Sequence, residues 1–140
     1  MAATNYAINK TLNRQFRKTY YNITTNYYYV GLSTTAIDEY GNGVTEPSHI
    51  SYERVPININ QSDSIFSSPE DGKATNRNSA VEFNVAREHW GRIREVFLAL
   101  DQKSSGSSIL FHSRIDPPFP VLEGTKIKFD IDSLILNRKE

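Results

Sequence analysis

The residues with side chains suited to catalysis or metal binding are few and widely spaced in this chain. Histidine is the residue type best suited to proton transfer near neutral pH, and the chain has His49, His89 and His112. None of them belongs to a metal-ligand spacing such as H-x-x-x-H, and no cysteine is present to supply a thiolate. The sequence therefore predicts no metal site and no cofactor.

Motifs for nucleophilic catalysis and phosphate binding are also missing from the sequence. It contains neither G-x-S-x-G nor G-x-G-x-x-G, nor a phosphate-binding loop. Asp130 and Asp132 would share one face of a strand, as paired catalytic carboxylates can, but Lys126 and Lys128 fall on the same face. A solvated ladder of ion pairs explains that pattern better than acid–base chemistry does. We therefore predict that the protein is not an enzyme.

Length and composition limit the remaining classes of protein. A chain of 140 residues is long enough to bury a core as one domain without disulfides. No stretch approaches the roughly 20 apolar residues of a membrane span, and the formal net charge is zero. We therefore expect a soluble protein of one domain, residues 1–140, that binds neither membrane nor nucleic acid.

The charges are nevertheless segregated along the chain. Residues 1–20 carry four basic residues and no acidic one, whereas residues 21–72 are rich in Asp and Glu, with Arg54 as their only base. This distribution predicts that a basic N-terminal element meets an acidic surface, in the same chain or on a neighbour.

The segment 89–101 is predicted to be the central strand around which the fold is organised. It contains the only tryptophan, Trp90, and becomes apolar on both alternating faces from Val96 onward, as in a strand covered on each side. An amphipathic helix is the alternative, but β-branched residues and the polar turn after Asp101 favour a strand. Alternation places Ile93, Glu95, Phe97 and Ala99 on one face. We predict a main core that contains Phe83, Trp90, Phe97, Ile127 and Phe129.

Further strands are predicted on both sides of this segment. They cover residues 27–33, 52–59, 80–85, 109–111 and 125–132, with 134–136 closing the fold. Pro56 predicts an edge strand, because proline cannot donate a ladder hydrogen bond. The same reasoning excludes the proline-rich residues 116–120 from a central strand. Residues 60–79 are predicted to form a long polar loop that is functional or ordered by a partner.

An α-helix is predicted from Thr4 to Lys18, with one apolar stripe and basic residues elsewhere on its surface. It would either pack on the sheet of its own chain or act as an arm, residues 1–20, that docks on another subunit. The fold class expected from all these elements is mainly β: an antiparallel β-sandwich or jelly-roll-like domain over residues 27–136, with one N-terminal α-helix. The residues expected to contact a partner are Ile8, Leu12, Arg14, Phe16, Arg17 and Lys18 in this arm, and Ile65 and Phe66 in the 60–79 loop.

The order of several short motifs resembles a family of small bacteriophage virion structural proteins, often labelled tail-fibre or minor structural proteins. The motifs are Tyr28-Tyr29-Val30-Gly31-Leu32-Ser33, then Gly41-Asn42-Gly43-Val44-Thr45-Glu46-Pro47, then Tyr52-Glu53-Arg54-Val55, and later Trp90-Gly91-Arg92-Ile93. This resemblance implies a β-sandwich component of the virion, present in many copies, assembled in the host bacterial cytoplasm and bound to other virion proteins.

The place of the protein in the particle is a separate question. A short all-β domain without heptads or a stalk suits a capsid decoration protein that binds the major capsid protein on a symmetric lattice. The alternative is a protein of the tail, baseplate or fibre, with host-surface carbohydrate binding as a further option. Capsid decoration is the preferred expectation, and in either place we expect a homo-oligomer in the particle.

Overall fold

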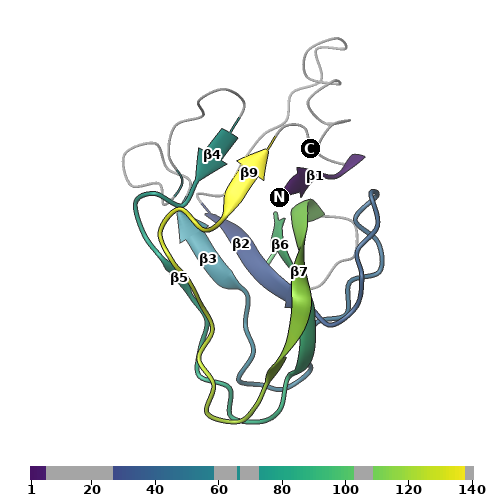
Figure 1. Ribbon diagram of the computed structural model, residues 1–140, viewed down its shortest axis with the longest axis vertical. Coiled ribbons are helices and arrows are strands. Elements are labelled where there is room, and N and C mark those ends of the chain that lie inside the picture. The colour runs from purple at the N-terminus through teal and green to yellow at the C-terminus, as the bar shows by residue number, and fades with distance from the viewer. Residues whose placement is uncertain (6–26, 59–65, 67–72, 103–108, 138–140) are drawn as a thin grey trace.

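The computed structural model describes residues 1–5, 27–58, 66, 73–102 and 109–137 (Figure 1). Within these residues the regular secondary structure is almost entirely β, with strands paired antiparallel except at one position. The strands are β1 (Ala2–Ala3), β2 (Tyr27–Ser33), β3 (Val55–Asn58), β4 (Lys73–Thr75), β5 (Val81–Glu82), β6 (Gly91–Ala99), β7 (Ile109–Val121), β8 (Lys128–Phe129) and β9 (Ile135–Asn137). No helix in the described part of the chain has the length and apolar character needed to cross a membrane.

Seven strands form one sheet in the order β3-β2-β6-β7-β1-β9-β4, and β5 and β8 form a second sheet. β6 lies between β2 and β7, as expected for the segment that is apolar on both faces. β3 lies at one edge of the large sheet, as predicted from Pro56, which lacks the N–H that a strand with neighbours on both sides would need. The mainly β, antiparallel class is confirmed. The second sheet has only two strands, so the predicted sandwich or jelly roll is not confirmed.

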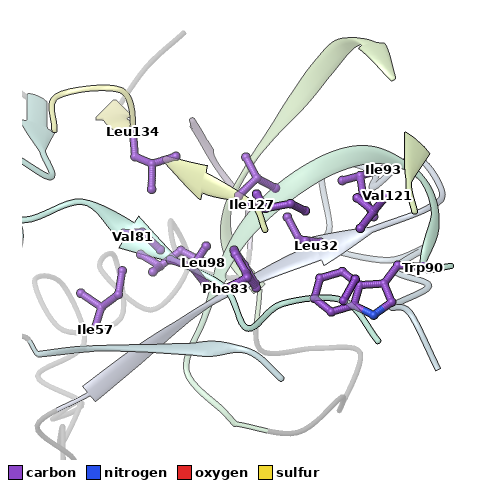
Figure 2. Close-up of a cluster of buried hydrophobic side chains, with 13 residues drawn as sticks. Leu32, Ile57, Val81, Phe83, Trp90, Ile93, Leu98, Val121, Ile127 and Leu134 are labelled. Carbon is purple, nitrogen blue, oxygen red and sulfur yellow. The ribbon is translucent and has the colours of Figure 1, made fainter. Parts of the chain in front are cut away.

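Figure 2 shows the main core. Its buried side chains come from the large sheet, from Val81 on β5 and from segments between strands: Val30, Leu32, Ile57, Val81, Phe83, Ala86, Trp90, Ile93, Val96, Leu98, Val121, Ile127 and Leu134. Phe129 is half-buried and packs against this cluster. Of the residues predicted for the core, Phe83, Trp90 and Ile127 belong to this cluster and Phe129 packs against it.

Phe97 departs from the predicted core, because it lies in a second buried cluster with Ile37, Ala99 and Ile109. Ile93, which alternation placed on the same face as Phe97, instead lies in the main core with Val96 and Leu98. The cause is a register shift between β6 and β7 at Ile93 and Glu95, which interrupts the simple alternation of faces. Residues that alternation alone would place together are therefore on opposite faces of the sheet.

Phe97 can lie flat against the sheet because its cross-strand neighbour on β2 is Gly31. A Cβ atom added at Gly31 would be 2.3 Å from Cζ of the Phe97 ring, far inside van der Waals contact. The absence of a side chain at Gly31 is therefore what makes room for the aromatic ring.

The prolines of residues 116–120 belong to β7, which corrects the prediction that excluded them from a central strand. β7 pairs with β1 only at Phe111 and His112, so its later residues have β6 as their only partner among the described strands. Pro117, which follows a cis peptide bond, and Pro118 fall in the shifted part, where no pairing with β6 is made. Proline is compatible with such a position because no ladder hydrogen bond is lost there.

The N-terminus is part of the large sheet, which the sequence did not predict. β1 pairs antiparallel with β7 and parallel with β9, and so joins the two halves of the sheet (Figure 1). Thr4, expected to cap a helix, is fully buried, and its Oγ1 donates to the Ile109 carbonyl oxygen at 2.6 Å. The predicted helix lies, beyond Asn5, outside the described residues.

Two other predicted segments differ from the structure. The polar loop predicted for 60–79 contains β4, and Asn76 near its end is fully buried, with its Oδ1 accepting from the Leu134 N–H. The predicted strand 125–132 ends earlier, because the chain turns between Asp130 and Ser133. Ile131, which alternation would place on the same face as the predicted core residues Ile127 and Phe129, is consequently 55% exposed.

Candidate functional site

A closed cluster of polar side chains is formed by the residues of two motifs quoted above. Arg54 is only 4% exposed, and its guanidinium grips the Glu46 carboxylate with Nε and Nη2 at 2.8 and 3.0 Å. The Tyr52 hydroxyl donates to the same carboxylate at 2.6 Å and accepts from the Leu32 N–H at 2.9 Å. Bidentate geometry of this kind is the strongest form of an ion pair.

The cluster ties three distant parts of the chain together. Arg54 Nη1 donates to the Asp101 carbonyl oxygen just after β6, and its guanidinium carbon lies 4.9 Å from the centre of the Phe97 ring. Burial, followed by the neighbouring Glu46 charge, raises the pKa of the Tyr52 hydroxyl well above its ordinary value of 10.0. The hydroxyl therefore stays protonated, and the cluster acts as a clamp with its donors already engaged.

Tyr52 also connects this clamp to the main core. Its ring stacks on Phe83 with centres 6.3 Å apart and meets the Trp90 ring edge-on at 5.3 Å. The Trp90 Nε1 donates to the Ser51 Oγ at 3.0 Å. The segment Tyr52-Glu53-Arg54 thus joins a polar clamp to an aromatic core, and its acidic partner Glu46 could be assigned only from the tertiary structure.

Another carboxylate, Glu95, is buried near the middle of β6. Glu95 is 2% exposed, and one of its oxygens lies 2.7 Å from Nδ1 of His112 on the neighbouring strand β7. Its other oxygen accepts the backbone N–H of Ile37. Because a buried carboxylate requires partners for its charge, this contact holds the 34–44 segment over the sheet and packs Ile37 on Phe97.

An open pocket of about 320 Å³ lies next to Glu95. Its walls come from Ala36, from Arg94 and Glu95 on β6, and from Arg114, Ile115, Asp116 and Pro118 on β7. The pocket is located where β7 leaves its register with β6, between Glu95↔Arg114 and Ile93↔Phe119. Sequence periodicity does not reveal that residues 115–118 leave the ladder beside the buried Glu95; only the tertiary structure shows it.

The three histidines do not converge in the structure. His112 binds Glu95, His49 lies 3.1 Å from the exposed Glu88, and His89 is exposed. Among the residues that the structure describes, no three His, Asp or Glu side chains are grouped as metal ligands.

The charged residues around β8 form ion pairs, as the sequence analysis expected for most of them. Lys126 Nζ lies 3.4 Å from Glu82, and Lys128 Nζ lies 3.6 Å from Asp130. Asp132 has left the shared face: it accepts from Thr75 Oγ1 at 2.6 Å and lies 3.6 Å from Arg77. Its backbone is in the left-handed region, with φ of 66°, which accounts for the change of direction.

The residues predicted to contact a partner are mostly outside the described part of the chain. Phe66 is the exception, and it is half-buried against the main core of its own chain. The remaining residues of that prediction are Ile8, Leu12, Arg14, Phe16, Arg17, Lys18 and Ile65.

Comparison with known proteins gives one result. The family model described as "Podophage GP4 fiber I protein gp80" matches residues 2–137. No curated protein matches the chain.

Proposed function

Because the chain belongs to the family described as podophage GP4 fiber I protein gp80, we propose that it is a structural subunit of a tail fibre. The observation that carries the proposal is the extent of the match, which covers residues 2–137 and therefore every described strand. The protein is a component of the phage particle and associates with other virion proteins. The finer assignment to a fibre is the proposal.

The family favours the alternative of the sequence analysis over its preferred expectation. Capsid decoration was preferred because a short domain without heptads or a stalk is poorly suited to form a fibre alone. That objection applies to a self-sufficient shaft. It does not apply to a compact subunit that is attached to a fibre or joins one to the particle, so we adopt the fibre assignment.

The described polar clusters support a structural role over catalysis. The carboxylates of Glu46 and Glu95 each hold donors from their own chain, and the Tyr52 hydroxyl is kept protonated. Groups arranged in this way stabilise loops against a sheet, whereas a general base must have a free lone pair directed at a substrate. We therefore propose that the protein works by binding and not by turnover.

The location in the particle is tested by immunogold labelling of purified phage with an antibody to this chain. The proposal expects gold particles along the fibres, and expects the chain in tails separated from heads by gradient centrifugation. Gold distributed over the capsid surface, with the chain in the head fraction, would restore capsid decoration and overturn the fibre assignment.

Attachment is proposed to use the basic N-terminal segment, on the evidence of the sequence alone. Arg14, Arg17 and Lys18 lie among the apolar residues Ile8, Leu12 and Phe16 and would steer the segment toward an acidic neighbour. Because β1 is part of the sheet, deletion of the whole N-terminus would also damage the fold, so charge reversal is the better test. Replacing these three residues with Glu should leave the protein folded but reduce its incorporation into particles, whereas Arg87→Glu with Arg92→Glu should not.

Two results would contradict this attachment surface. One is normal incorporation of the triple variant. The other is binding of the purified wild-type chain to particles that lack it with no weakening as salt rises, since exposed charge attraction is screened over about 8 Å at physiological ionic strength.

A further inference from the structure

The loops before β6 and after β7 lie at the end of the molecule away from β1 (Figure 1). Trp90 joins them to the segment before β3, because its Nε1 donates to Ser51 Oγ at 3.0 Å and its backbone N–H donates to the Val121 carbonyl oxygen at 2.9 Å. The Gly124 N–H donates to the Ala86 carbonyl oxygen at 2.7 Å. These hydrogen bonds fix the loops relative to one another. We call the surface that they form the tip, which consists of residues 47–52, 86–90 and 121–125.

The tip exposes two large apolar side chains. Ile50 is 90% exposed and Leu122 is 52% exposed. Single apolar residues are common on protein surfaces, but these two lie directly beside Ser51 and Val121, the residues that are hydrogen-bonded to Trp90. Packing within the chain does not require an apolar side chain at Ile50, because nearly all of that side chain is in water. A contact made outside the chain explains the residue type.

The turn that carries Ile50 is held on both sides. His49 Nδ1 accepts the Ser51 N–H at 3.0 Å, and the His49 carbonyl oxygen accepts the Tyr52 N–H at 3.0 Å. His49 Nε2 lies 3.1 Å from the Glu88 carboxylate on the adjacent loop. Ile50 is therefore presented on a preorganised turn, and less conformational entropy is lost when a partner covers it.

The unpaired charges of the tip favour a second copy of the same chain as the partner. Arg87 and Glu123 are exposed, and neither forms an ion pair with any residue that the structure describes. They lie on the two loops that the hydrogen bond from Gly124 to Ala86 joins. In a two-fold contact the same patch occurs on both subunits, so Arg87 of each copy can face Glu123 of the other. A uniformly acidic or basic partner would instead meet one like charge at every tip.

We propose that the tip is a self-association surface, at which two copies of this chain meet around a two-fold axis with Ile50 and Leu122 buried and Arg87 facing Glu123. The inference rests on the proposed function, because copies held on the same fibre have a high effective concentration, at which a small contact is sufficient. Attachment to the particle through the N-terminal segment is a separate contact. Variants of the tip should therefore still be incorporated into particles.

The test is sedimentation equilibrium of the purified full chain at about 10 μM to 1 mM, because interfaces below about 1,200 Å² are weak. The wild type should show a reversible monomer–dimer equilibrium. Ile50→Ser should raise the dissociation constant about tenfold or more. The matched control is Ile131→Ser, which removes an isoleucine that is 55% exposed outside the tip and should leave the dissociation constant unchanged.

An exchange of charges tests the two-fold arrangement. Arg87→Glu should weaken the dimer about threefold or more, because it places two carboxylates opposite each other in each half of the contact. Adding Glu123→Arg should restore the wild-type dissociation constant, since the pair is then re-formed with its signs reversed. A double variant that dimerises no better than Arg87→Glu alone would overturn the two-fold contact.

Three further outcomes would overturn the proposal. They are a wild-type chain that remains monomeric at the highest concentration, a dimer that Ile50→Ser does not weaken, and a dimer that Ile131→Ser weakens equally. Each is independent of the fibre assignment, because sedimentation uses the purified chain and gold labelling uses the particle. Gold on the fibres with a monomeric chain would remove the self-association surface alone, whereas a tip-dependent dimer of a chain found on the capsid would remove the fibre assignment alone.

Discussion

Removing the negative charge of Glu46 should destabilise the protein strongly. In the Glu46→Gln variant, the buried Arg54 guanidinium loses the carboxylate that now receives two of its N–H groups at 2.8 and 3.0 Å. The Tyr52 hydroxyl loses an ionised acceptor at 2.6 Å in the same step. Gln is nearly isosteric with Glu, so the change tests the charge and its hydrogen bonds while keeping the packing volume.

The expected cost follows from the burial of both partners. The side chains of Arg54 and Glu46 are 2% and 11% exposed, so water cannot replace the lost carboxylate. Breaking a buried pair by removing one partner typically costs about 3–5 kcal/mol, because the remaining charge is left uncompensated. Total stabilities of domains are about 5–15 kcal/mol, so the variant should still fold and be measurable.

Urea unfolding followed by Trp fluorescence is the appropriate assay, because Trp90 is the only tryptophan and lies in the core. The matched control is Glu88→Gln, which removes the exposed carboxylate beside His49 and should cost less than about 1 kcal/mol. The double variant Glu46→Gln with Arg54→Met should be more stable than Glu46→Gln alone, since it removes the orphaned charge.

The refuting result is equally specific. If Glu46→Gln costs no more than the Glu88→Gln control, the clamp does not hold the segment at 46–54 against the sheet. If the double variant is instead less stable than Glu46→Gln by the full cost of an independent substitution, Arg54 and Glu46 are not energetically coupled.

Four other outcomes are expected. Gly31→Ala should cost about 1–3 kcal/mol through overlap with the Phe97 ring, and adding Phe97→Leu should recover part of that loss; an unchanged urea midpoint would contradict the contact. Because the Tyr52 pKa is raised by folding, stability from its protonated hydroxyl is fully present below pH 10.0 and is lost as pH rises above it, so Tyr52→Phe should lose less stability between pH 10 and 11 than wild type does. Trp90→Ala should cost about 3–5 kcal/mol in thermal or urea unfolding monitored by circular dichroism, and a loss below 1 kcal/mol would remove Trp90 from the core. Deleting residues 1–4 should lower the unfolding free energy by about 2–4 kcal/mol, because several buried hydrogen bonds of roughly 0.5–1.5 kcal/mol each are lost; native stability in this variant would show that β1 is dispensable.

Local sequence pattern was sufficient to predict two inner strands, β6 and β2, and one edge strand, β3. The apolar run after Trp90 predicted the central strand β6, the tyrosine-rich segment predicted β2 over Tyr27–Ser33, and Pro56 predicted an edge strand. Each of these predictions depends on a property of the strand itself: alternation, β propensity or a missing donor. The order of short motifs also predicted the bacteriophage virion family, because motif order is carried by the sequence.

Only the tertiary structure decided the features that depend on register and long-range pairing. β1 is two residues long, so no period could reveal it, and its stability comes entirely from β7 and β9 at the far end of the chain. The register shift at Ile93 puts Ile93 and Phe97 on opposite faces of the sheet, and it opens the pocket next to Glu95. Local sequence determines which residues can form a strand, whereas the pairing of strands distant in sequence determines which side chains meet, because a shift of one residue moves a side chain to the opposite face.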